Sequence, residues 1–465
     1  MATKTARTAG YKCTECGWTT VKWVGRCGEC QAWGTVTEVG AATAVRTTAA
    51  RVIERPAVPI AQVDASRAQA CRTGVDEFDR VLGGGLVPGA VALVAGEPGI
   101  GKSTLLLDVA ARAAQPGSSV LYVSGEESSA QVRGRAERIG AVADHLYLAA
   151  ETDLATVLGH IQQVKPSLVV VDSVQTISSA EVEGAAGNVG QVREVAAALI
   201  QAAKRAGIAM LLVGHVTKEG SIAGPRVLEH LVDVVVQFEG DRHSRLRLVR
   251  AVKNRYGPTD EVGCFDLDDR GITGLSDPSG LFLSQRTTHV PGTCVTVTLE
   301  GRRPLVTEVQ ALVTKSTLPT PRRTTSGLDS SRVAMVLAVL ERRCEVPFAG
   351  ADAYLSTVGG ARLTEPAADL ALAMALAGAL VDRPLVPGAV AIGEVGLAGE
   401  VRQVPGLPRR LSEAARLGFS RAFVPVGARR DGRLPDGIEV IEVPDVRSAV
   451  LAAIPQRTGA RELAR

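Results

Sequence analysis

The chain has 465 residues, a length that usually accommodates two or three domains. Its 46% hydrophobic and 22% charged residues are typical of a globular protein with ordinary apolar cores. A net charge of +3 excludes a uniformly basic surface, so nucleic-acid binding would need local basic patches, and 3% aromatic residues argue against broad base-stacking platforms.

The sequence shows no segment that would direct the chain to a membrane. The N-terminus lacks the apolar stretch of a secretory signal, and the longest uncharged apolar run, 370–381, is too short to span a bilayer. We therefore expect a cytoplasmic protein without a membrane partner. In that reducing compartment its eight cysteines should not form a disulfide framework.

Four cysteines near the N-terminus form two CxxC pairs, Cys13 with Cys16 and Cys27 with Cys30. Four thiolates at this spacing can converge tetrahedrally on Zn²⁺, which favours sulfur ligands, and leave no open position for catalysis. A redox dithiol would need one pair beside a thioredoxin-like pattern. The spacing predicts a structural zinc knuckle over residues 1–36, whereas Cys71, Cys264, Cys294 and Cys344 are scattered core or surface residues.

A segment rich in Ala, Thr, Val and Pro, residues 37–65, has little periodicity and is predicted to be a linker. Strands and helices then alternate, as in a parallel sheet covered by helices. The first strand, 91–95, leads into the run GEPGIGKST and a helix over 105–114. This is the context of a phosphate-binding loop (P-loop).

In such a loop, backbone N–H groups surround a triphosphate and the helix N-terminus adds a favourable dipole. Lys102 would contact the outer phosphates, and the Ser103 hydroxyl would hold Mg²⁺. We therefore predict ATP binding. The predicted nucleotide-binding residues are Gly96, Glu97, Pro98, Gly99, Ile100, Gly101, Lys102, Ser103 and Thr104.

Two further strands end in carboxylates. The strand 119–123 precedes Glu126 and Glu127, and the strand 168–171 ends at Asp172, where it can approach the Mg²⁺ shell. We choose Glu126 as the catalytic base that orients the attacking water. The alternative is that both glutamates are N-terminal charges of the next helix, with Ser128 as its cap.

A third strand, 208–213, ends at Gly214-His215. His215 could sense the γ-phosphate, or it could be an ordinary structural histidine; the sequence does not decide between them. The polar, basic loop 217–226 that follows could contact a nucleic-acid backbone, which makes Lys218 and Arg226 candidate DNA-binding residues.

Six cations lie between residues 242 and 255. Arg245 and Arg247 have the same strand parity, so we expect both to project from one face, as candidate DNA contacts, while Leu246, Leu248 and Val252 are buried on the other. A solvated charged face is the ordinary interpretation. Lys253 and Arg255 differ because they end the strand, from where they could reach the triphosphate of a neighbouring subunit, as arginine fingers do.

Together these motifs resemble the bacterial RadA (Sms) family of recombination proteins over nearly the whole chain. That family has a zinc knuckle, a RecA-like ATPase core and a domain similar to the Lon protease, in this order. Its signature KNRFG appears here as KNRYG at 253–257, with Tyr256 in place of phenylalanine. The resemblance implies an α/β protein with a RecA-like P-loop NTPase core, an N-terminal zinc knuckle and a C-terminal α/β Lon-protease-like domain.

The resemblance also implies a function: a homo-hexamer that hydrolyses ATP while moving on single-stranded and branched DNA. It would promote branch migration at intermediates made by RecA recombinase, in the repair of DNA damage. By similarity with RecA, Lys253 and Arg255 would act on the ATP of the adjacent subunit.

The remaining chain is assigned by the same resemblance: an ATPase domain at 66–275, a Lon-protease-like domain at 276–456 and a tail at 457–465. A strand is expected over 295–299 and a small-residue helix over 367–380. Where Lon carries its serine this chain has Pro366-Ala367, and where Lon has its lysine it has Gly406-Leu407-Pro408. Lacking both the nucleophile and its base, the domain should not be a protease and is expected to be a scaffold. Its basic pairs at 302–303, 342–343, 409–410 and 429–430 could hold DNA, or any one of them could be ordinary surface charge.

Three classes of function therefore compete. The first is the DNA-dependent ATPase. The second is an ATP-gated RecA-like regulator without motor activity. The third, an ATP-dependent protease, is disfavoured by Ala367 and Pro408.

Overall fold

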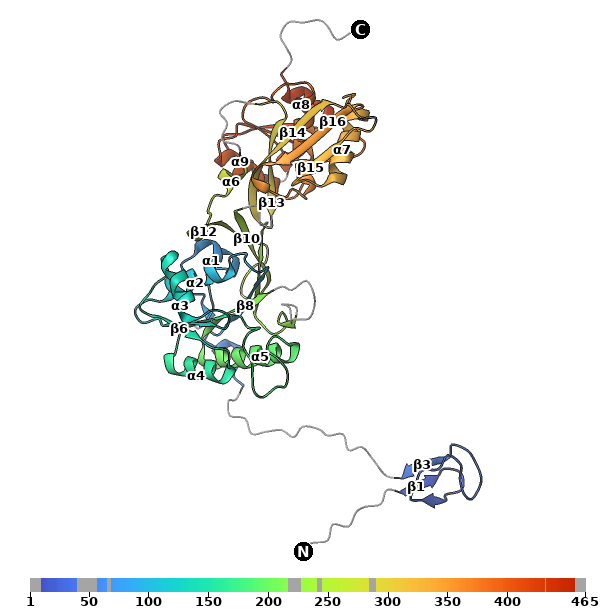
Figure 1. Ribbon diagram of the computed structural model, residues 1–465. Coiled ribbons are helices and arrows are strands. Elements are labelled where there is room, and N and C mark those ends of the chain that lie inside the picture. The colour runs from blue at the N-terminus through green and yellow to red at the C-terminus, as the bar shows by residue number, and fades with distance from the viewer. Residues whose placement is uncertain are drawn as a thin grey trace. The chain divides into compact units, whose positions relative to one another are not determined.

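A computed structural model describes residues 10–39, 57–64, 68–215, 227–240, 245–283, 290–430 and 432–455 (Figure 1). The chain divides into two compact units, Met1–Asp64 and Ala65–Arg465. In the described parts of the chain, no helix is both long enough and apolar enough to span a membrane.

The first unit contains a small antiparallel sheet in the order β2-β1-β3. Its strands are β1 (Gly10–Cys13), β2 (Thr19–Thr20) and β3 (Val36–Val39), and a 3-10 turn, η1, covers Ile60–Gln62. The core is very small: Cys13, Cys27 and Val36 are buried, with Trp18 packed against them. So little buried area cannot hold the segment folded alone, which agrees with a metal-stabilised ribbon.

The first part of the second unit is a nine-stranded sheet in the order β12-β11-β10-β9-β4-β8-β7-β5-β6. The six strands from β9 to β6 in this order run parallel, and β10, β11 and β12 continue the sheet antiparallel. The bounds are β4 Val91–Gly96, β5 Val120–Ser124, β6 Leu146–Ala150, β7 Leu168–Asp172, β8 Ala209–His215, β9 Val234–Glu239, β10 Leu246–Asn254, β11 Val262–Asp268 and β12 Gly271–Gly274.

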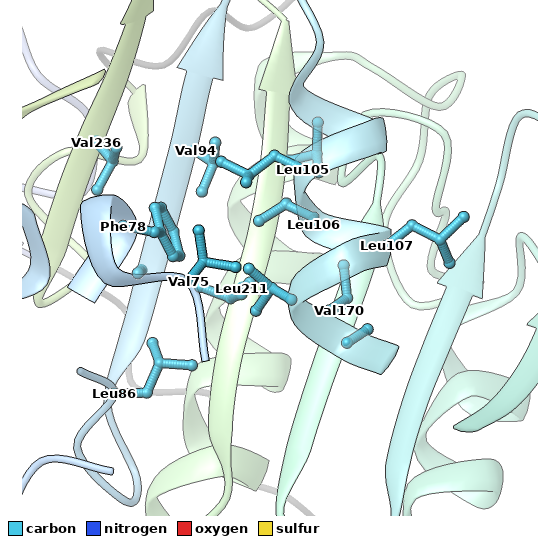
Figure 2. Packing of buried hydrophobic residues seen from close by; sticks show 14 of the residues in the cluster. Val75, Phe78, Leu86, Val94, Leu105, Leu106, Leu107, Val170, Leu211 and Val236 are labelled. Carbon is cyan, nitrogen blue, oxygen red and sulfur yellow. The ribbon is translucent and has the colours of Figure 1, made fainter. Parts of the chain in front are cut away.

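Helices cover both faces of this sheet, so its central strands are apolar throughout. On one face, Leu105 and Leu106 of α2 lie over Val94 of β4 and Leu211 of β8 (Figure 2). On the other face α4 and α5 pack against the alternate residues of the same strands, such as Leu93. The helices are α1 Asp76–Leu82, α2 Lys102–Ala113, α3 Ser129–Arg138, α4 Leu154–Val164 and α5 Val189–Ala206.

The second part of this unit is a seven-stranded mixed sheet in the order β15-β16-β14-β13-β17-β20-β21. Helices α7, α8 and α10 pack on one face and α9 on the other. The strands are β13 Thr293–Glu300, β14 Arg303–Lys315, β15 Arg323–Ser326, β16 Ala351–Thr357, β17 Ala389–Ala391, β20 Arg421–Pro425 and β21 Glu439–Val443, with a separate hairpin of β18 Glu394–Val395 and β19 Val401–Arg402. The helices are α6 Ser279–Phe282, α7 Ser330–Arg343, α8 Asp369–Leu380, α9 Leu407–Arg416 and α10 Val446–Ala453, and the 3-10 turns are η4 Val358–Gly360, η5 Pro366–Ala368 and η6 Ala428–Arg430.

The predicted α/β fold class is confirmed, and the predicted strands and helices lie within a few residues of the observed ones. The expected helix over 367–380 is divided into η5 and α8, and α8 is buried on nearly every side, as its small residues require. The four scattered cysteines are also as expected: Cys264 and Cys294 are buried in the two sheets, Cys71 is exposed and Cys344 is half-buried.

The orientation expected for β10 is wrong. Arg247, Val249 and Ala251 are buried, whereas Leu246 and Leu248 are half-buried and Val252 is 54% exposed. The apolar side of this strand includes an arginine because Arg247 finds an acceptor inside the protein, the carbonyl of Ile100. Alternation of charged and apolar residues therefore predicted the strand but not which side it buries.

Candidate functional site

The P-loop joins the end of β4 to the start of α2, and glycine is required at two of its positions. Gly101 caps the helix with a left-handed φ of 110°. At Gly96, a Cβ would lie 2.9 Å from the Cβ of Phe238, so no larger residue fits. These conformations turn the loop around the N-terminus of α2, where anions bind favourably.

Lys102 is buried at the start of α2, and its ammonium group lies inside this loop. Nζ donates to the carbonyls of Gly96 at 2.8 Å and Glu97 at 2.9 Å. Burial lowers the pKa of Lys102 to about 8, although the nearby charges of Asp172 and Glu126 act in the opposite direction. The Lys102 ammonium is therefore close enough to Asp172 and Glu126 to interact electrostatically with both predicted carboxylates.

The strand register brings the other predicted residues to the same edge of the sheet. Ser124 of β5 is level with Asp172 of β7, and Gly96 of β4 is level with His215 of β8. Because these strands are parallel, their carboxyl ends meet at one edge, the usual ligand-binding edge of open α/β sheets.

Asp172 is buried at this edge and has a partner that sequence reasoning missed. The hydroxyl of Tyr122 donates to Asp172 Oδ2 at 2.6 Å. Burial, followed by the charge and hydrogen bond of Asp172, raises the pKa of Tyr122 well above its ordinary value, so Tyr122 acts as a donor. The sequence signal that could have revealed this partner is a tyrosine two residues before Ser124, the polar end of the buried strand β5.

Glu126 and Glu127 contact different partners. Glu126 Oε1 accepts a hydrogen bond from the Ser173 hydroxyl at 2.7 Å and lies 3.1 Å from Nε2 of His215. Glu127 forms an ion pair with Arg135 instead. Ser128 caps α3 together with Gln131 in a capping box. The helix cap expected in the alternative interpretation of this segment is therefore present.

The cations of β10 lie in different environments. Arg247 is only 7% exposed, and its Nε donates to the Ile100 carbonyl of the P-loop at 3.3 Å, which removes it from the exposed face that we expected. Arg245 lies on the surface and forms two hydrogen bonds with Asp266, at 2.9 and 2.5 Å. The other two candidate DNA contacts, Lys218 and Arg226, lie outside the described residues.

Lys253 and Arg255 lie at the opposite edge of the sheet from the P-loop. Lys253 is level with Val235 of β9, which is level with Leu93 of β4, three residues before Gly96. Its Nζ donates to the carbonyls of Glu229 and Val232, at 2.7 and 2.8 Å. Arg255 donates to Asp233 at 3.1 Å. Neither cation approaches the P-loop of its own chain.

The four N-terminal cysteines form one cluster. Their sulfur atoms lie within 4.8 Å of one another, with 3.7 Å between Cys13 and Cys30 and 3.4 Å between Cys16 and Cys27. Tetrahedral zinc with bonds of about 2.3 Å would separate its sulfur ligands by roughly 3.8 Å, so the cluster fits the metal.

The surroundings of the cysteines act on the four thiols differently. The Thr35 hydroxyl, followed by backbone amides, lowers the pKa of Cys13 to about 6. The Ala32 amide lowers the pKa of Cys30, but burial and the neighbouring thiols outweigh it and raise that pKa to about 12. Four thiols this close ionise together only when a cation balances them.

Ala367 and Pro408, the two positions that the sequence comparison set against the Lon dyad, belong to the part of the chain that forms the seven-stranded sheet and its helices. Ala367 is buried in η5, and Pro408 is the second residue of α9. Beside them Arg410 is fully buried, donating to the Val297 carbonyl at 2.7 Å and to Glu365 at 2.9 Å. Arg303 is buried as well, so one arginine of the 302–303 pair and one of the 409–410 pair are internal to the fold, whereas Arg342 and Arg343 are both exposed.

The comparisons with known proteins agree with these sites. Residues 57–221 match the AAA domain family, and residues 11–38 match the rubredoxin metal binding domain family. A "DNA repair protein RadA" of Mycolicibacterium smegmatis is 57% identical over 95% of this chain and 96% of its own length.

Proteins of the same name from other bacteria are also similar. The protein of Mycobacterium tuberculosis is 55% identical over 97% of this chain and 96% of its own length. That of Streptococcus pyogenes serotype M1 is 46% identical over 94% of this chain and 97% of its own length. With near-complete coverage at this identity, and with the zinc-binding and P-loop sites in place, the chain belongs to the RadA family of DNA repair proteins.

Proposed function

We propose that this protein is a DNA-dependent ATPase, a hexameric translocase that promotes branch migration of RecA-made recombination intermediates in double-strand break repair. The observation that carries the proposal is the distribution of charge over the nine-stranded sheet. Lys102, Asp172 and Glu126 gather at one edge, and Lys253 and Arg255 at the other. On this proposal, each protomer would supply two halves of an ATPase site that is completed between neighbours.

The P-loop, Gly96–Thr104, would hold the triphosphate, with Lys102 on its outer phosphates. Ser103 and Asp172 are the residues suited to hold Mg²⁺ at the same edge. The ion supplies charge neutralisation of the phosphates when bound. Tyr122 keeps the Asp172 carboxylate in place by its hydrogen bond, and the buried strands β5 and β7 fix both side chains.

Glu126 would orient the attacking water and accept its proton at a carboxylate oxygen. Its partners support this role: the Ser173 hydroxyl fixes Oε1, and His215 lies beside the same atom. Glu127 is held by Arg135 and is not available for it. Because His215 precedes the loop that contains Lys218 and Arg226, DNA bound at that loop could change the position of Glu126.

Lys253 and Arg255 would act on the nucleotide of the next subunit. Lys253 is level with Leu93, three residues before Gly96 along β4, which places it roughly 10 Å of strand away from the P-loop. That separation exceeds the reach of a lysine side chain, so contact with a triphosphate requires another protomer. A closed ring gives every site such a neighbour.

The remaining parts of the proposal follow the family. Residues 1–36 form the zinc domain, 66–275 the ATPase and 276–456 a Lon-like scaffold without protease activity. DNA, single-stranded or branched, would contact Arg245 and the loop with Lys218 and Arg226, and RecA would be a protein partner in the cytoplasm.

The ATPase rate with and without single-stranded DNA, across a salt series, tests the proposal. We expect stimulation by DNA and an affinity that falls steeply with salt, because bound counterions are released. Glu126→Gln should lose at least about 100-fold in rate while it still binds ATP, and Glu127→Gln, the matched control, should lose little. Nucleotide-dependent assembly without stimulation by DNA would identify the ATP-gated regulator instead.

A further inference from the structure

All three tryptophans of the 465-residue chain belong to the zinc ribbon: Trp18, Trp23 and Trp33. Trp18 has a structural role, because it packs in the small core and closes against Gly28, where a Cβ would lie 2.8 Å from its ring. Trp23 and Trp33 are different. They are 65% and 74% exposed, although tryptophan is one of the side chains that gains most from burial.

The two exposed rings lie side by side. A Cβ at Gly25 would be 3.7 Å from Cη2 of Trp23 and 3.8 Å from Cζ3 of Trp33, so both indoles border the same point. The backbone holds them there: Gly34 N–H donates to the Gly25 carbonyl at 2.9 Å, and Arg26 and Trp33 form a bridge between the two strands of this turn. These contacts hold the backbone of Gly25 and Trp33 together within the zinc ribbon.

Cations accompany these rings. The guanidinium of Arg26 lies 5.6 Å from the ring centroid of Trp33, a cation–π distance, and its Nε donates to the Gln31 carbonyl. Lys22 is exposed immediately before Trp23. Lys22 and Arg26 are the charged residues nearest Trp23 in the sequence, and Glu29 lies four residues before Trp33.

We propose that Lys22, Trp23, Arg26 and Trp33, the tryptophan patch, bind unpaired bases of single-stranded nucleic acid by stacking. Flat aromatic faces accept any base, and neighbouring cations contact the phosphates. The inference rests on the proposed function only for the identity of the polymer as DNA. The patch is small, consistent with the low aromatic content of the chain.

The net charge of the zinc ribbon determines whether electrostatic attraction or stacking would supply most of the affinity. Over residues 10–39, Lys12, Lys22 and Arg26 are balanced by Glu15, Glu29 and Glu38. A zinc ion with four thiolates adds net negative charge. Attraction to the strand as a whole is therefore small, and the affinity of the patch comes from stacking. Its contribution should depend only weakly on salt, unlike that of a basic DNA channel.

The test uses the zinc-loaded full-length protein, whose intrinsic tryptophan emission comes entirely from the ribbon. Titration with an oligo-dT single strand should quench this emission, and a blunt duplex of the same length should quench it much less, since its bases are already stacked. Trp23→Ala/Trp33→Ala should weaken single-strand binding at least about fivefold per ring. The salt dependence of binding should stay unchanged.

Control variants keep the result interpretable. Trp23→Phe/Trp33→Phe retains flat rings and should restore most of the affinity. Val21→Ala removes an exposed apolar residue next to the patch and should have no effect. Zinc content of one ion per chain in every variant shows that the ribbon is folded.

Unchanged emission at saturating DNA, together with unchanged affinity of the alanine variant, would overturn the inference. Emission that responds to protein concentration or to added RecA, and not to DNA, would identify the patch as a protein contact and overturn it equally. The DNA-stimulated ATPase rate is measured in parallel. If stimulation persists while the emission stays constant, the patch is wrong and the proposed function stands.

Discussion

Tyr122 and Asp172 show how single residues prepare the candidate site. They come from adjacent parallel strands, where Tyr122 is level with Val170, two residues before Asp172 on the same face. The tyrosine therefore reaches the carboxylate diagonally, and the 2.6 Å hydrogen bond holds it at the edge beside Lys102. A carboxylate fixed in advance loses less freedom when a cation binds.

Removing the hydroxyl should weaken the response to Mg²⁺. In Tyr122→Phe the ring still fills the core, but Asp172 loses one donor, a change of about 1 kcal/mol. We expect the Mg²⁺ concentration for half-maximal binding of a fluorescent ATP analogue to rise roughly fivefold. Tyr147→Phe, on the surface of β6, is the matched control. An unchanged Mg²⁺ requirement would show that Tyr122 serves only packing.

Lys102 makes nucleotide affinity depend on pH. Its pKa is lowered to about 8, so the free protein loses the ammonium charge as pH rises through 8, whereas bound phosphates would favour the charged form. Affinity for ATP should be constant below about pH 7 and fall above pH 8, with proton uptake on binding at pH 8–9. Calorimetry in buffers of different ionisation enthalpy measures that uptake. Equal affinity at pH 7 and pH 9 would contradict it.

At the scale of elements, ion pairs connect the hairpin of β13 and β14 to helix α1 and to strand β10 of the nine-stranded sheet. Arg303 at the start of β14 bonds Glu77 of α1 at 2.6 Å, with both side chains buried. Arg250 of β10 joins Glu239 at 2.9 Å and also pairs with Glu300 of β13. Since β10 also presents Arg247 to the P-loop, this strand connects the nucleotide site with the C-terminal sheet.

Breaking the buried pair should destabilise the second unit. Arg303→Met leaves the buried Glu77 carboxylate with only the longer 3.6 Å ion pair to the exposed Arg80 and should cost about 3–5 kcal/mol of unfolding free energy. The double variant Glu77→Gln/Arg303→Met should recover much of it, because no buried charge remains. Arg302→Met, an adjacent exposed arginine with longer contacts, should cost less than about 1 kcal/mol. Urea unfolding compares the three, and similar losses for Arg302 and Arg303 would show that the pair contributes little.

At the scale of the whole molecule, the two edges of the sheet must belong to different protomers' sites if Lys253 and Arg255 touch ATP. Within one chain, Lys253 donates to the carbonyls of Glu229 and Val232, and Arg255 donates to the Asp233 carboxylate. Forming a site between subunits would exchange those contacts for phosphate oxygens. Cooperative turnover would follow, because each protomer then depends on its neighbour.

Mixing two inactive chains tests this dependence. Lys253→Ala retains an intact P-loop, and Lys102→Ala retains the two cations that would act on the neighbouring subunit. A mixed ring therefore contains some interfaces in which an intact P-loop faces intact cations. We expect ATPase activity in the mixture that neither chain has alone, with a maximum near equal proportions. Lys102→Ala mixed with Lys102→Ala/Lys253→Ala, which offers no complete interface, is the control and should stay inactive. No recovery in mixed rings would mean that each chain acts within itself.

The sequence by itself determined the features that depend on local spacing. The two CxxC pairs, the P-loop between a strand and a helix, and the strand that ends at Asp172 each lie within a few consecutive residues. Their chemistry requires particular residue types at fixed separations, so the pattern is sufficient to predict them.

Only the tertiary structure decided which side chains meet across the chain. Tyr122 and Asp172 are 50 residues apart, Arg303 and Glu77 are 226 apart, and the burial of Arg247 depends on an acceptor 147 residues away. The exposure of Trp23 and Trp33 was likewise not visible in their spacing. Such contacts depend on strand order and on which face each strand turns inward, and one residue of register reverses that face.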